Sequence, residues 1–271
     1  MKRRLLPILM TLVLVCALPI WAAFVTSGDV TNPLVSTAWA TLPDLQAKID
    51  AAADNATITL DSNTEIAATL QITKNLTLDL NGHVLKMTGS GSVLKVSGRA
   101  TLTITDSRPQ NPHTEPYVGL PAGGVITGGE GTNVTGIYYV GGAVFLENDT
   151  TLKLEGGTIT ENSSSGGSVF ISDEKAVFEM SGGTITGETV GVRNNVGTFT
   201  MTGGRITGCR DRGVYVHNGY MSMSGTAYIG GNPGAKEDIY VREPDHKHTD
   251  LSVTGGTVEG NVRIEFGANL G

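Results

Sequence analysis

The sequence predicts an all-β fold: a right-handed parallel β-helix with three strands per coil and a short N-terminal capping helix. Two observations carry this prediction. A phrase with two adjacent glycines recurs along the chain, and short runs of alternating apolar and polar residues surround each copy. Glycine accounts for 37 of the 271 residues, about double its usual share, which disfavours long helices.

The first 40 residues are expected to be a targeting region. A basic start, "MKRR", precedes an uncharged run over residues 5–25, and "AWA", which ends at Ala40, has the small-x-small form of a cleavage site. We expect export, to the cell surface or into the medium, with cleavage near Ala40 or near Ala22 and Ala23. The alternative is an uncleaved anchor, because the uncharged run is long enough to span a bilayer. Any membrane contact would then be made through this leader.

A short helix is predicted over residues 41–56, "TLPDLQAKIDAAADNA". Thr41 and Asp44 have the spacing of a capping box, and apolar residues follow at helical intervals. Asn55 is the expected stop. We expect this helix to cover the open edges of the first strands in a β-helix that occupies residues 57–271.

The glycine phrase is clearest in "MSGGTITG" at 180–187, and it has similar copies at 154–161, 201–208 and 253–260. In each copy, alternating apolar residues precede the glycines and one Ile or Val follows them. These apolar runs begin at Leu152, Phe178, Phe199, Leu251 and, in a degraded copy, Met221. We interpret the phrase as scaffold: the glycines turn the chain and the single aliphatic residue points inward.

A second phrase precedes each copy of the first. It reads "AVFLE" at 143–147, "SVFIS" at 168–172, "GVRNN" at 191–195, "GVYVH" at 213–217 and "DIYVR" at 238–242. One period therefore holds three short strands, and a period of about 20–30 residues is typical of a solenoid coil. Stacked coils would place their strands about 4.8 Å apart. A propeller is the main alternative, but its blades need about 40 residues.

The segments "TLDLNGHVLKM" and "LTITDS", within residues 77–107, and the "MSGGTITG" copies resemble the right-handed β-helix repeat proteins that bacteria export, in the pectin-lyase-like superfamily. The resemblance covers about residues 42–266 and implies the fold. It implies less about function, because that superfamily holds lyases, hydrolases, phage tailspikes and adhesins. Asp79 and Asp106 lie in these motifs, and we expect them to be turn residues.

Charge and cysteine content exclude several classes of function. The formal net charge is −7, which argues against nucleic acid as a partner and disfavours tight binding to acidic glycans. The two cysteines, Cys16 in the leader and Cys209, cannot form a disulfide framework, so we expect Cys209 to pack as a small apolar residue. No cofactor is expected.

The catalytic residue sets that the resemblance implies, acidic calcium ligands with a basic group or clustered aspartates, are not found. One charged cluster remains, formed by Arg210, Asp211, Arg212 and His217. It is either a solvated corner with a local ion pair or a residual sugar-cleaving site in which Asp211 serves as acid or base.

A second charged cluster lies at 243–250, "EPDHKHTD". His246 and His248 have a spacing that can chelate a metal on an extended segment, and a solvated loop is the alternative.

The second phrase also predicts a stripe along one wall of the solenoid. Its central residue alternates with inward-pointing neighbours, so one side chain per coil should face outward: Phe145, Phe170, Arg193, Tyr215 and Tyr240, with Arg263 as a continuation. Exposed aromatic residues interleaved with arginine suit a glycan or a protein partner. The alternative is self-stacking, which stabilises neighbouring strands whether or not a ligand binds.

Together these patterns predict an exported, cell-surface-associated β-helix protein with a structural or adhesin-like binding role. The alternative is a polysaccharide lyase or glycoside hydrolase with a divergent active site. The chain stops at "FGANLG" after the last predicted coil. We expect the edge of that coil to be open to self-association or to a protein partner.

Overall fold

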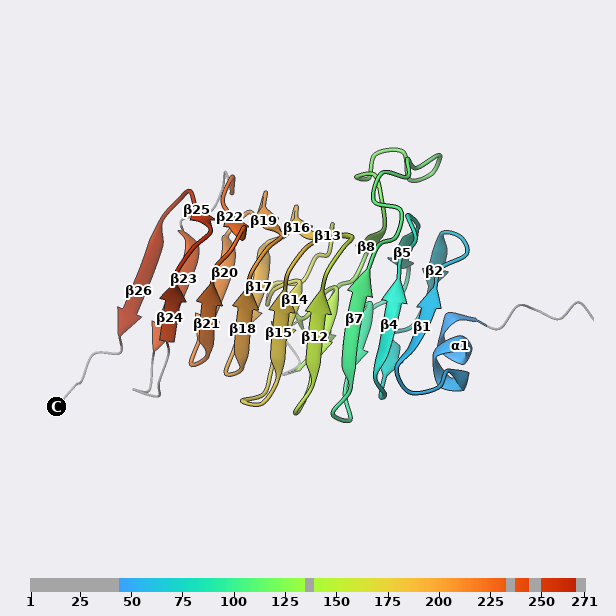
Figure 1. The fold of residues 1–271 in the computed structure, drawn as a ribbon, viewed down its shortest axis with the longest axis horizontal. Helices are drawn as coiled ribbons and strands as arrows, with labels where there is room; N and C mark the ends of the chain where they lie inside the picture. Colours follow the sequence, from blue (N-terminus) through green and yellow to red (C-terminus); the bar gives the residue numbers. More distant parts are fainter. Residues whose placement is uncertain (1–43, 135–138, 233–236, 244–249, 267–271) are drawn as a thin grey trace, which may run out of the picture. The chain divides into compact units, whose positions relative to one another are not determined.

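The computed structural model describes residues 44–134, 139–232, 237–243 and 250–266, which belong to one unit spanning Pro43–Gly271. The predicted leader, 1–40, lies outside the described residues, as do His246 and His248. The described chain forms one helix, three long parallel sheets and one small hairpin (Figure 1).

Each turn of the chain contributes one strand to each of three eight-stranded sheets. Sheet A contains β1 (Ala56–Thr59), β4 (Leu76–Asp79), β7 (Thr101–Thr105), β12 (Thr151–Leu154), β15 (Val177–Met180), β18 (Thr198–Met201), β21 (Tyr220–Met223) and β24 (Asp250–Val253). Sheet B contains β2 (Thr64–Ile66), β5 (Val84–Met87), β8 (Val125–Thr127), β13 (Thr158–Thr160), β16 (Thr184–Thr186), β19 (Arg205–Thr207), β22 (Tyr228–Ile229) and β25 (Thr257–Val258). Sheet C contains β3 (Leu70–Ile72), β6 (Leu94–Val96), β11 (Val144–Leu146), β14 (Val169–Ile171), β17 (Val190–Asn194), β20 (Arg212–His217), β23 (Glu237–Glu243) and β26 (Val262–Phe266).

The predicted parallel β-helix with three strands per coil is confirmed. Every neighbouring pair within the three sheets is parallel, and equivalent residues of successive repeats pair directly. Leu152 lies opposite Phe178, Phe178 opposite Phe199, and Phe199 opposite Met221. The degraded copy at Met221 therefore holds the same place in its coil as the intact ones.

The core fills the interior of the coils, as the alternating pattern predicts. Except in the last copy, where Leu251 and Val258 are half-buried and Val253 is exposed, the apolar residues of the glycine phrase are buried in one continuous cluster that extends from Leu45 to Val241. Phe178 and Phe199 stack inside it with ring centroids 4.9 Å apart. Cys209 is fully buried in the same cluster, which confirms its expected role as a small apolar residue.

The paired glycines make the corner between sheets A and B, in accord with their predicted role. At Gly183 the φ angle is +69°, which a residue with a side chain rarely adopts. At Gly182 an added Cβ would come within 2.1 Å of the Glu155 carbonyl oxygen in the preceding coil. One glycine is needed for the turn and the other for the close approach of stacked backbones.

The helix α1 (Leu45–Ala51) is shorter than predicted. Its N-cap is Asp44, whose side chain accepts a 2.7 Å hydrogen bond from the backbone N–H of Ala47. Thr41 lies outside the described residues, and the predicted stop, Asn55, instead adopts a positive φ of 62° in the turn before β1. Asp44 both occupies the N-cap and bonds the third helical residue, which leaves no need for a cap further upstream.

Two additions interrupt the regular coils. Residues 106–124 form a long loop between β7 and β8, which projects above the strands in Figure 1. The antiparallel hairpin of β9 (Thr132–Asn133) and β10 (Tyr139–Val140) separates β8 from β11. At the start of the loop, Asp79 accepts a bond from the Ser107 N–H, and Asp106 accepts one from the Gly124 N–H. Asp79, at the end of β4, and Asp106 thus bond backbone N–H groups at a corner of the coil, a structural role in accord with the prediction.

Candidate functional site

The predicted stripe lies on sheet C in the expected register. Phe145 pairs with Phe170, Phe170 with Arg193, Arg193 with Tyr215, and Tyr215 with Tyr240. Arg263 follows Tyr240 in the same register, as predicted, and Lys95, which precedes Phe145, extends the stripe beyond the prediction. It therefore forms a ladder in which a cationic residue precedes, separates and follows two pairs of aromatic residues.

The phenylalanine half of this ladder is covered, contrary to the expectation of exposed aromatic residues. Phe145 and Phe170 are only 6% and 7% exposed, and their rings stack with centroids 5.6 Å apart. They form a small cluster with Val140 of the hairpin strand β10, separate from the main core. Both rings point away from the interior, but a hairpin that the repeat pattern did not reveal packs against them.

The tyrosine half lies among arginine side chains. The rings of Tyr215 and Tyr240 stack with centroids 5.1 Å apart, and Tyr215 keeps partial exposure while Tyr240 is 8% exposed. The Arg193 guanidinium lies 4.9 Å from the Tyr215 ring centroid, and that of Arg212 lies 4.6 Å from the Tyr240 centroid. Each guanidinium group thus lies close to a tyrosine ring in an attractive cation–π contact, which restricts the motion of both side chains.

We define the Arg–Tyr face as the outer surface of β17, β20, β23 and β26 formed by Arg193, Arg212, Tyr215, Tyr240, Arg242 and Arg263. It holds four of the ten arginines of the chain. The guanidinium groups of Arg242 and Arg263 are exposed. The Tyr240 ring is enclosed by its neighbours, so the accessible groups are mainly guanidinium N–H groups and the edge of Tyr215.

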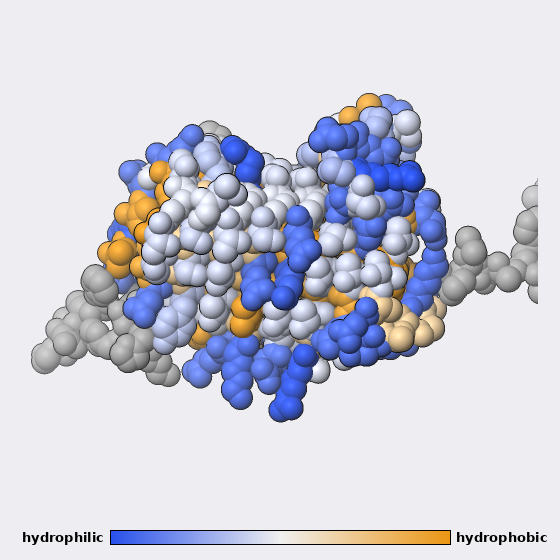
Figure 2. Space-filling view, viewed as in Figure 1, coloured by the Kyte–Doolittle hydropathy of each residue, from blue (hydrophilic) through white to orange (hydrophobic). Residues whose placement is uncertain are grey.

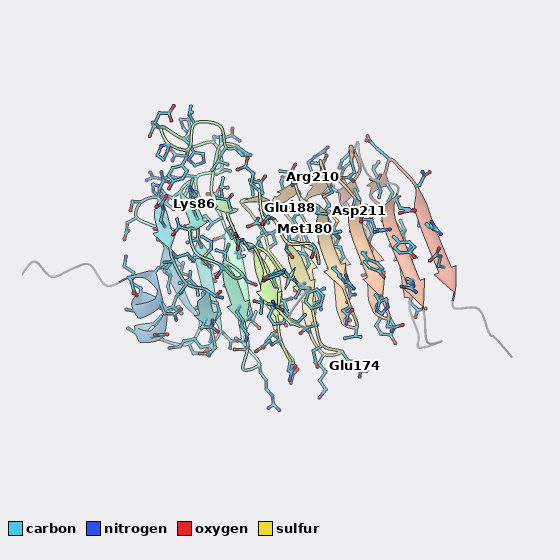
Figure 3. The ribbon with its side chains drawn as sticks, turned by 180° about the vertical axis from the view of Figure 1, so that it is seen from behind. Lys86, Glu174, Met180, Glu188, Arg210 and Asp211 are labelled. Atoms are coloured by element: carbon cyan, nitrogen blue, oxygen red, sulfur yellow. The ribbon has the colours of Figure 1, made fainter. Side chains whose placement is uncertain are left out.

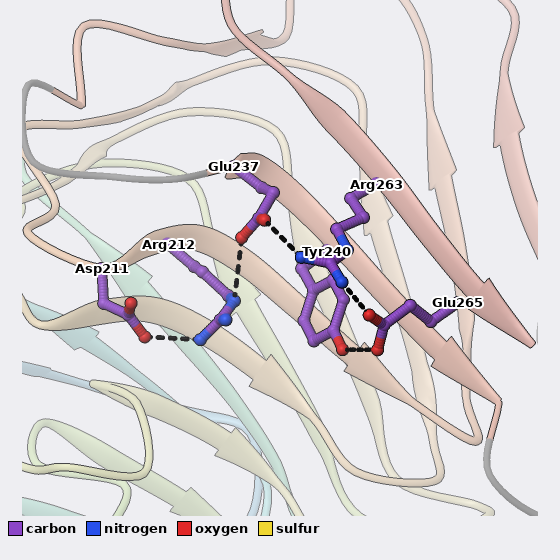
Figure 4. Close-up of polar contacts among 6 residues, drawn as sticks. All are labelled: Asp211, Arg212, Glu237, Tyr240, Arg263 and Glu265. Atoms are coloured by element: carbon purple, nitrogen blue, oxygen red, sulfur yellow. Dashed lines mark hydrogen bonds and ion pairs between the residues drawn. The ribbon is translucent and has the colours of Figure 1, made fainter. Parts of the chain in front are cut away.

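Acidic side chains brace part of this face (Figure 4). Arg212 pairs with Asp211 at 2.5 Å, and its Nε lies 3.4 Å from a carboxylate oxygen of the buried Glu237. Arg263 bridges Glu237, at 3.4 Å, and Glu265, which also accepts a hydrogen bond from the Tyr240 hydroxyl. Glu237 thereby receives a cation from each neighbouring strand, which offsets the cost of its burial.

The hydroxyl of Tyr240 and the carboxylate of Glu265 act on each other's protonation. Burial and the hydrogen bond to Glu265 raise the pKa of Tyr240. The same hydrogen bond, assisted by Arg263, lowers the pKa of the Glu265 carboxyl. At neutral pH the tyrosine is therefore a proton donor in the hydrogen bond and the glutamate is its charged acceptor.

The four predicted catalytic candidates are only partly brought together. Asp211 and Arg212 form an ion pair, as expected if the cluster is a solvated corner. Arg210 donates a 3.4 Å hydrogen bond to the Gly187 carbonyl. His217 ends β20, about 16 Å along the strand from Arg212. Its ring meets the edge of Tyr215, with centroids 6.0 Å apart. A joint acid–base role for Asp211 and His217 is therefore not supported by their spacing.

A buried polar corner beside this cluster was not predicted. Glu188 is 1% exposed and accepts hydrogen bonds from the backbone N–H and the side-chain amide of Asn162, at 3.2 and 3.0 Å. Burial raises the pKa of its carboxyl to about 7, against the opposing effect of these bonds. Figure 3 shows Glu188 close to Arg210, whose backbone N–H donates to the Glu188 carbonyl. The signal in the sequence is a single acidic residue at a repeat position that holds a small or polar residue in the adjacent coils.

Metal ligands and membrane spans were searched in the described part of the chain. No group of three or more His, Cys, Asp or Glu side chains there could hold a metal ion. Nor does that part contain a helix whose length and apolarity would suffice to cross a bilayer.

The chain was also compared with known proteins. No protein-family model matches it, and no curated protein and no solved structure matches it either. The fold is assigned from the strand pairing within this chain.

Proposed function

We propose that this chain is an exported, cell-surface-associated β-helix protein of bacterial origin, related to the pectin-lyase-like superfamily, with a structural or adhesin-like role. Its function would be to bind an acidic segment of a protein partner through the Arg–Tyr face. The basic "MKRR" start and the uncharged run that follows support export. The repeated glycine phrase supports the superfamily relationship.

One observation carries the binding role. The chain as a whole is acidic, with a net charge of −7, yet the Arg–Tyr face holds four guanidinium groups against three carboxylates, those of Asp211, Glu237 and Glu265. Arginine and tyrosine are enriched among the residues that contribute most to protein interfaces. A local basic area on an acidic protein favours an acidic partner through charge complementarity.

The ladder contributes rigidity to this role. Because Tyr215 is packed between Tyr240 and Arg193, little side-chain freedom remains to be lost on binding. A sugar ring cannot stack on the faces of Tyr240, because Tyr215 lies over one face while Arg212 and Arg263 lie nearby. This geometry favours a protein segment over a glycan at this face.

Binding of the full chain to a fluorescent poly-glutamate peptide tests the proposal. We expect binding that weakens as salt rises from about 50 mM to about 500 mM, since charge pairs at an exposed face are screened. The double variant Arg193→Gln and Arg242→Gln should bind at least about tenfold more weakly. The control Arg108→Gln removes a similar exposed charge on the 106–124 loop and should bind like the parent chain.

Two results would overturn the proposal. The first is equal binding by the parent chain and the double variant. The second is release of reducing sugar from a polysaccharide by the full chain, with loss of that release in Asp211→Ala, which would instead support the alternative of a polysaccharide lyase or glycoside hydrolase.

A further inference from the structure

One row of the solenoid contains a residue that does not fit its backbone. At the corner after the sheet B strands β8, β16, β19 and β22, the chain has Gly128, Gly187, Gly208 and Gly231, all with φ between 62° and 82°. The strand register places Glu161 at the same corner after β13, with a φ of 55°. A glutamate in this left-handed region is strained, whereas glycine is not.

Glu161 lines an open pocket of about 210 Å³. The pocket lies between the outer face of sheet B and the 106–124 loop. Its other lining residues are Lys86, Pro116, Tyr117, Gly119, Leu120 and Thr127. Figure 2 shows the surface hollowed beside this loop, over the middle strands of sheet B. The strained residue is therefore found where its carboxylate can reach a ligand, which is the usual place for stored backbone strain.

The wall of this pocket is held in place by specific bonds. The Tyr117 hydroxyl donates a 2.7 Å hydrogen bond to Glu65 on β2. This bond raises the pKa of Tyr117 to about 12, so its hydroxyl stays protonated. At the base of the loop, Asp106 accepts from the N–H groups of Gly82 and Gly124 at 2.7 and 2.6 Å. The loop is thus a fixed wall, and a ligand would meet a pocket that is already formed.

The two charged side chains of the pocket, Lys86 and Glu161, differ in how far they are paired with neighbouring groups. Lys86 lies 3.9 Å from a Glu65 oxygen, and its ammonium is 5.7 Å from the Tyr117 ring centroid. The Glu161 carboxylate has no hydrogen-bond or ion-pair partner among the residues that the structure describes. The pocket therefore offers a free anionic acceptor, a partly engaged cationic donor and an apolar wall from Pro116 and Leu120.

We propose that this pocket binds one ring of an uncharged sugar chain. Ligand hydroxyls would donate to Glu161 and accept from Lys86, while the apolar faces of the ring would pack against Leu120 and Pro116. A uronic acid is disfavoured, because Glu161 would repel its carboxylate and Lys86, the cation of the pocket, is already shared with Glu65. The volume is below that of pockets for larger ligands, about 300–1,000 Å³, which suits a single ring.

The site is separate from the Arg–Tyr face on sheet C, so the two proposals can fail independently. Beyond the pocket, the outer face of sheet B continues with the half-buried threonines Thr184 and Thr186 of β16, which pair with Thr158 and Thr160 of β13. Their hydroxyls would line the path of the remaining sugar chain, one coil further along the solenoid.

The deciding variant is Glu161→Gly, which gives this coil the residue found at the same corner in its neighbours. A full-length chain is first applied to an array of uncharged, acidic and amino glycans, and the strongest uncharged glycan is then titrated by calorimetry. We expect binding to uncharged glycans by the parent chain. Glu161→Gly should bind at least tenfold more weakly, while its midpoint of urea unfolding is unchanged or higher. A binding loss without a stability loss cannot be attributed to misfolding.

Asp149→Gly is the matched control, because Asp149 also has a φ of 55° but lies outside this pocket. It should bind like the parent chain. Glu161→Gln, which keeps the side chain and removes the charge, should give an intermediate loss. The proposal is overturned if no uncharged glycan binds, if only acidic or amino glycans bind, or if Glu161→Gly retains the parent affinity.

Discussion

At the scale of single residues, the structure separates side chains that pack from side chains that remain available. Phe145 and Arg193 occupy equivalent positions in their coils, yet a hairpin covers the first and not the second. Alternation along a strand determines the side of the sheet on which a residue lies. Exposure depends in addition on what packs over that side, and here β10 covers only the phenylalanine half of the ladder.

Glu188 gives a prediction at this scale. Its folded-state pKa of about 7 is higher than the unfolded value of 4.5, so the folded chain binds more protons between these values. The free energy of unfolding should therefore fall as pH rises from about 4.5 to about 7, and then level off. Glu188→Gln, which keeps an acceptor for Asn162, should stabilise the chain at about pH 8 by up to about 3 kcal/mol and much less at about pH 4.

Urea unfolding at both pH values checks this prediction. Glu179→Gln is a suitable control, because Glu179 is half-exposed on sheet A and forms an ion pair with Lys153 at the surface. It should change stability little, and by a similar amount at the two pH values. An equal gain for Glu188→Gln at both pH values would show that its carboxyl is not the source of the pH dependence.

At the scale of elements, the repeat pattern predicted what recurs and missed what does not. Leu152, Phe178 and Phe199 share one register because each coil must present an apolar residue at the same interior position. The 106–124 loop and the β9–β10 hairpin occur once each, so no periodicity could place them. The hairpin covers the phenylalanine half of the stripe, and the loop forms a wall of the Glu161 pocket. The candidate sites were therefore harder to predict than the fold.

The same limit applies to the pocket residue itself. Glu161 ends the copy "LEGGTITE", where the three other copies end in glycine. The substitution is visible in the sequence, but its meaning depends on the positive φ at that corner and on the loop opposite it. Neither property follows from the apolar pattern.

The helix α1 provides the prediction for elements. Asp44→Ala should lower the free energy of unfolding by about 1 kcal/mol, because the Ala47 N–H loses its capping acceptor. Asp50→Ala, on the same helix, is the control and should cost less than about 0.5 kcal/mol, since the Asp50 carboxylate is exposed and accepts from the exposed Gln46 side chain. Urea unfolding measures both. Equal effects of the two substitutions would mean that the cap does not stabilise the solenoid.

At the scale of the whole molecule, the two ends of the described solenoid differ. At the first coil, Leu45 and Ile49 of α1 are buried in the core, and the Gln46 side chain bonds both the N–H and the carbonyl of Gln71 on β3. At the last described coil, Val253, Val262 and Ile264 are 45–49% exposed. Since each coil of a solenoid is stabilised mainly by its neighbours, we expect stability to be lowest at this second end.

Hydrogen exchange followed by mass spectrometry tests this expectation. Amides of β24 and β26 should exchange first, those of β1 and β3 later, and those of β15 and β18 last, because the central strands have a partner on both sides and the stacked Phe178 and Phe199 beneath them. Gln46→Ala should speed exchange in β3 and leave β24 unchanged, because the helix protects only the coil that it contacts. Uniform exchange rates along the solenoid would instead show that it opens in one cooperative step, with coupling between coils stronger than the difference between its ends.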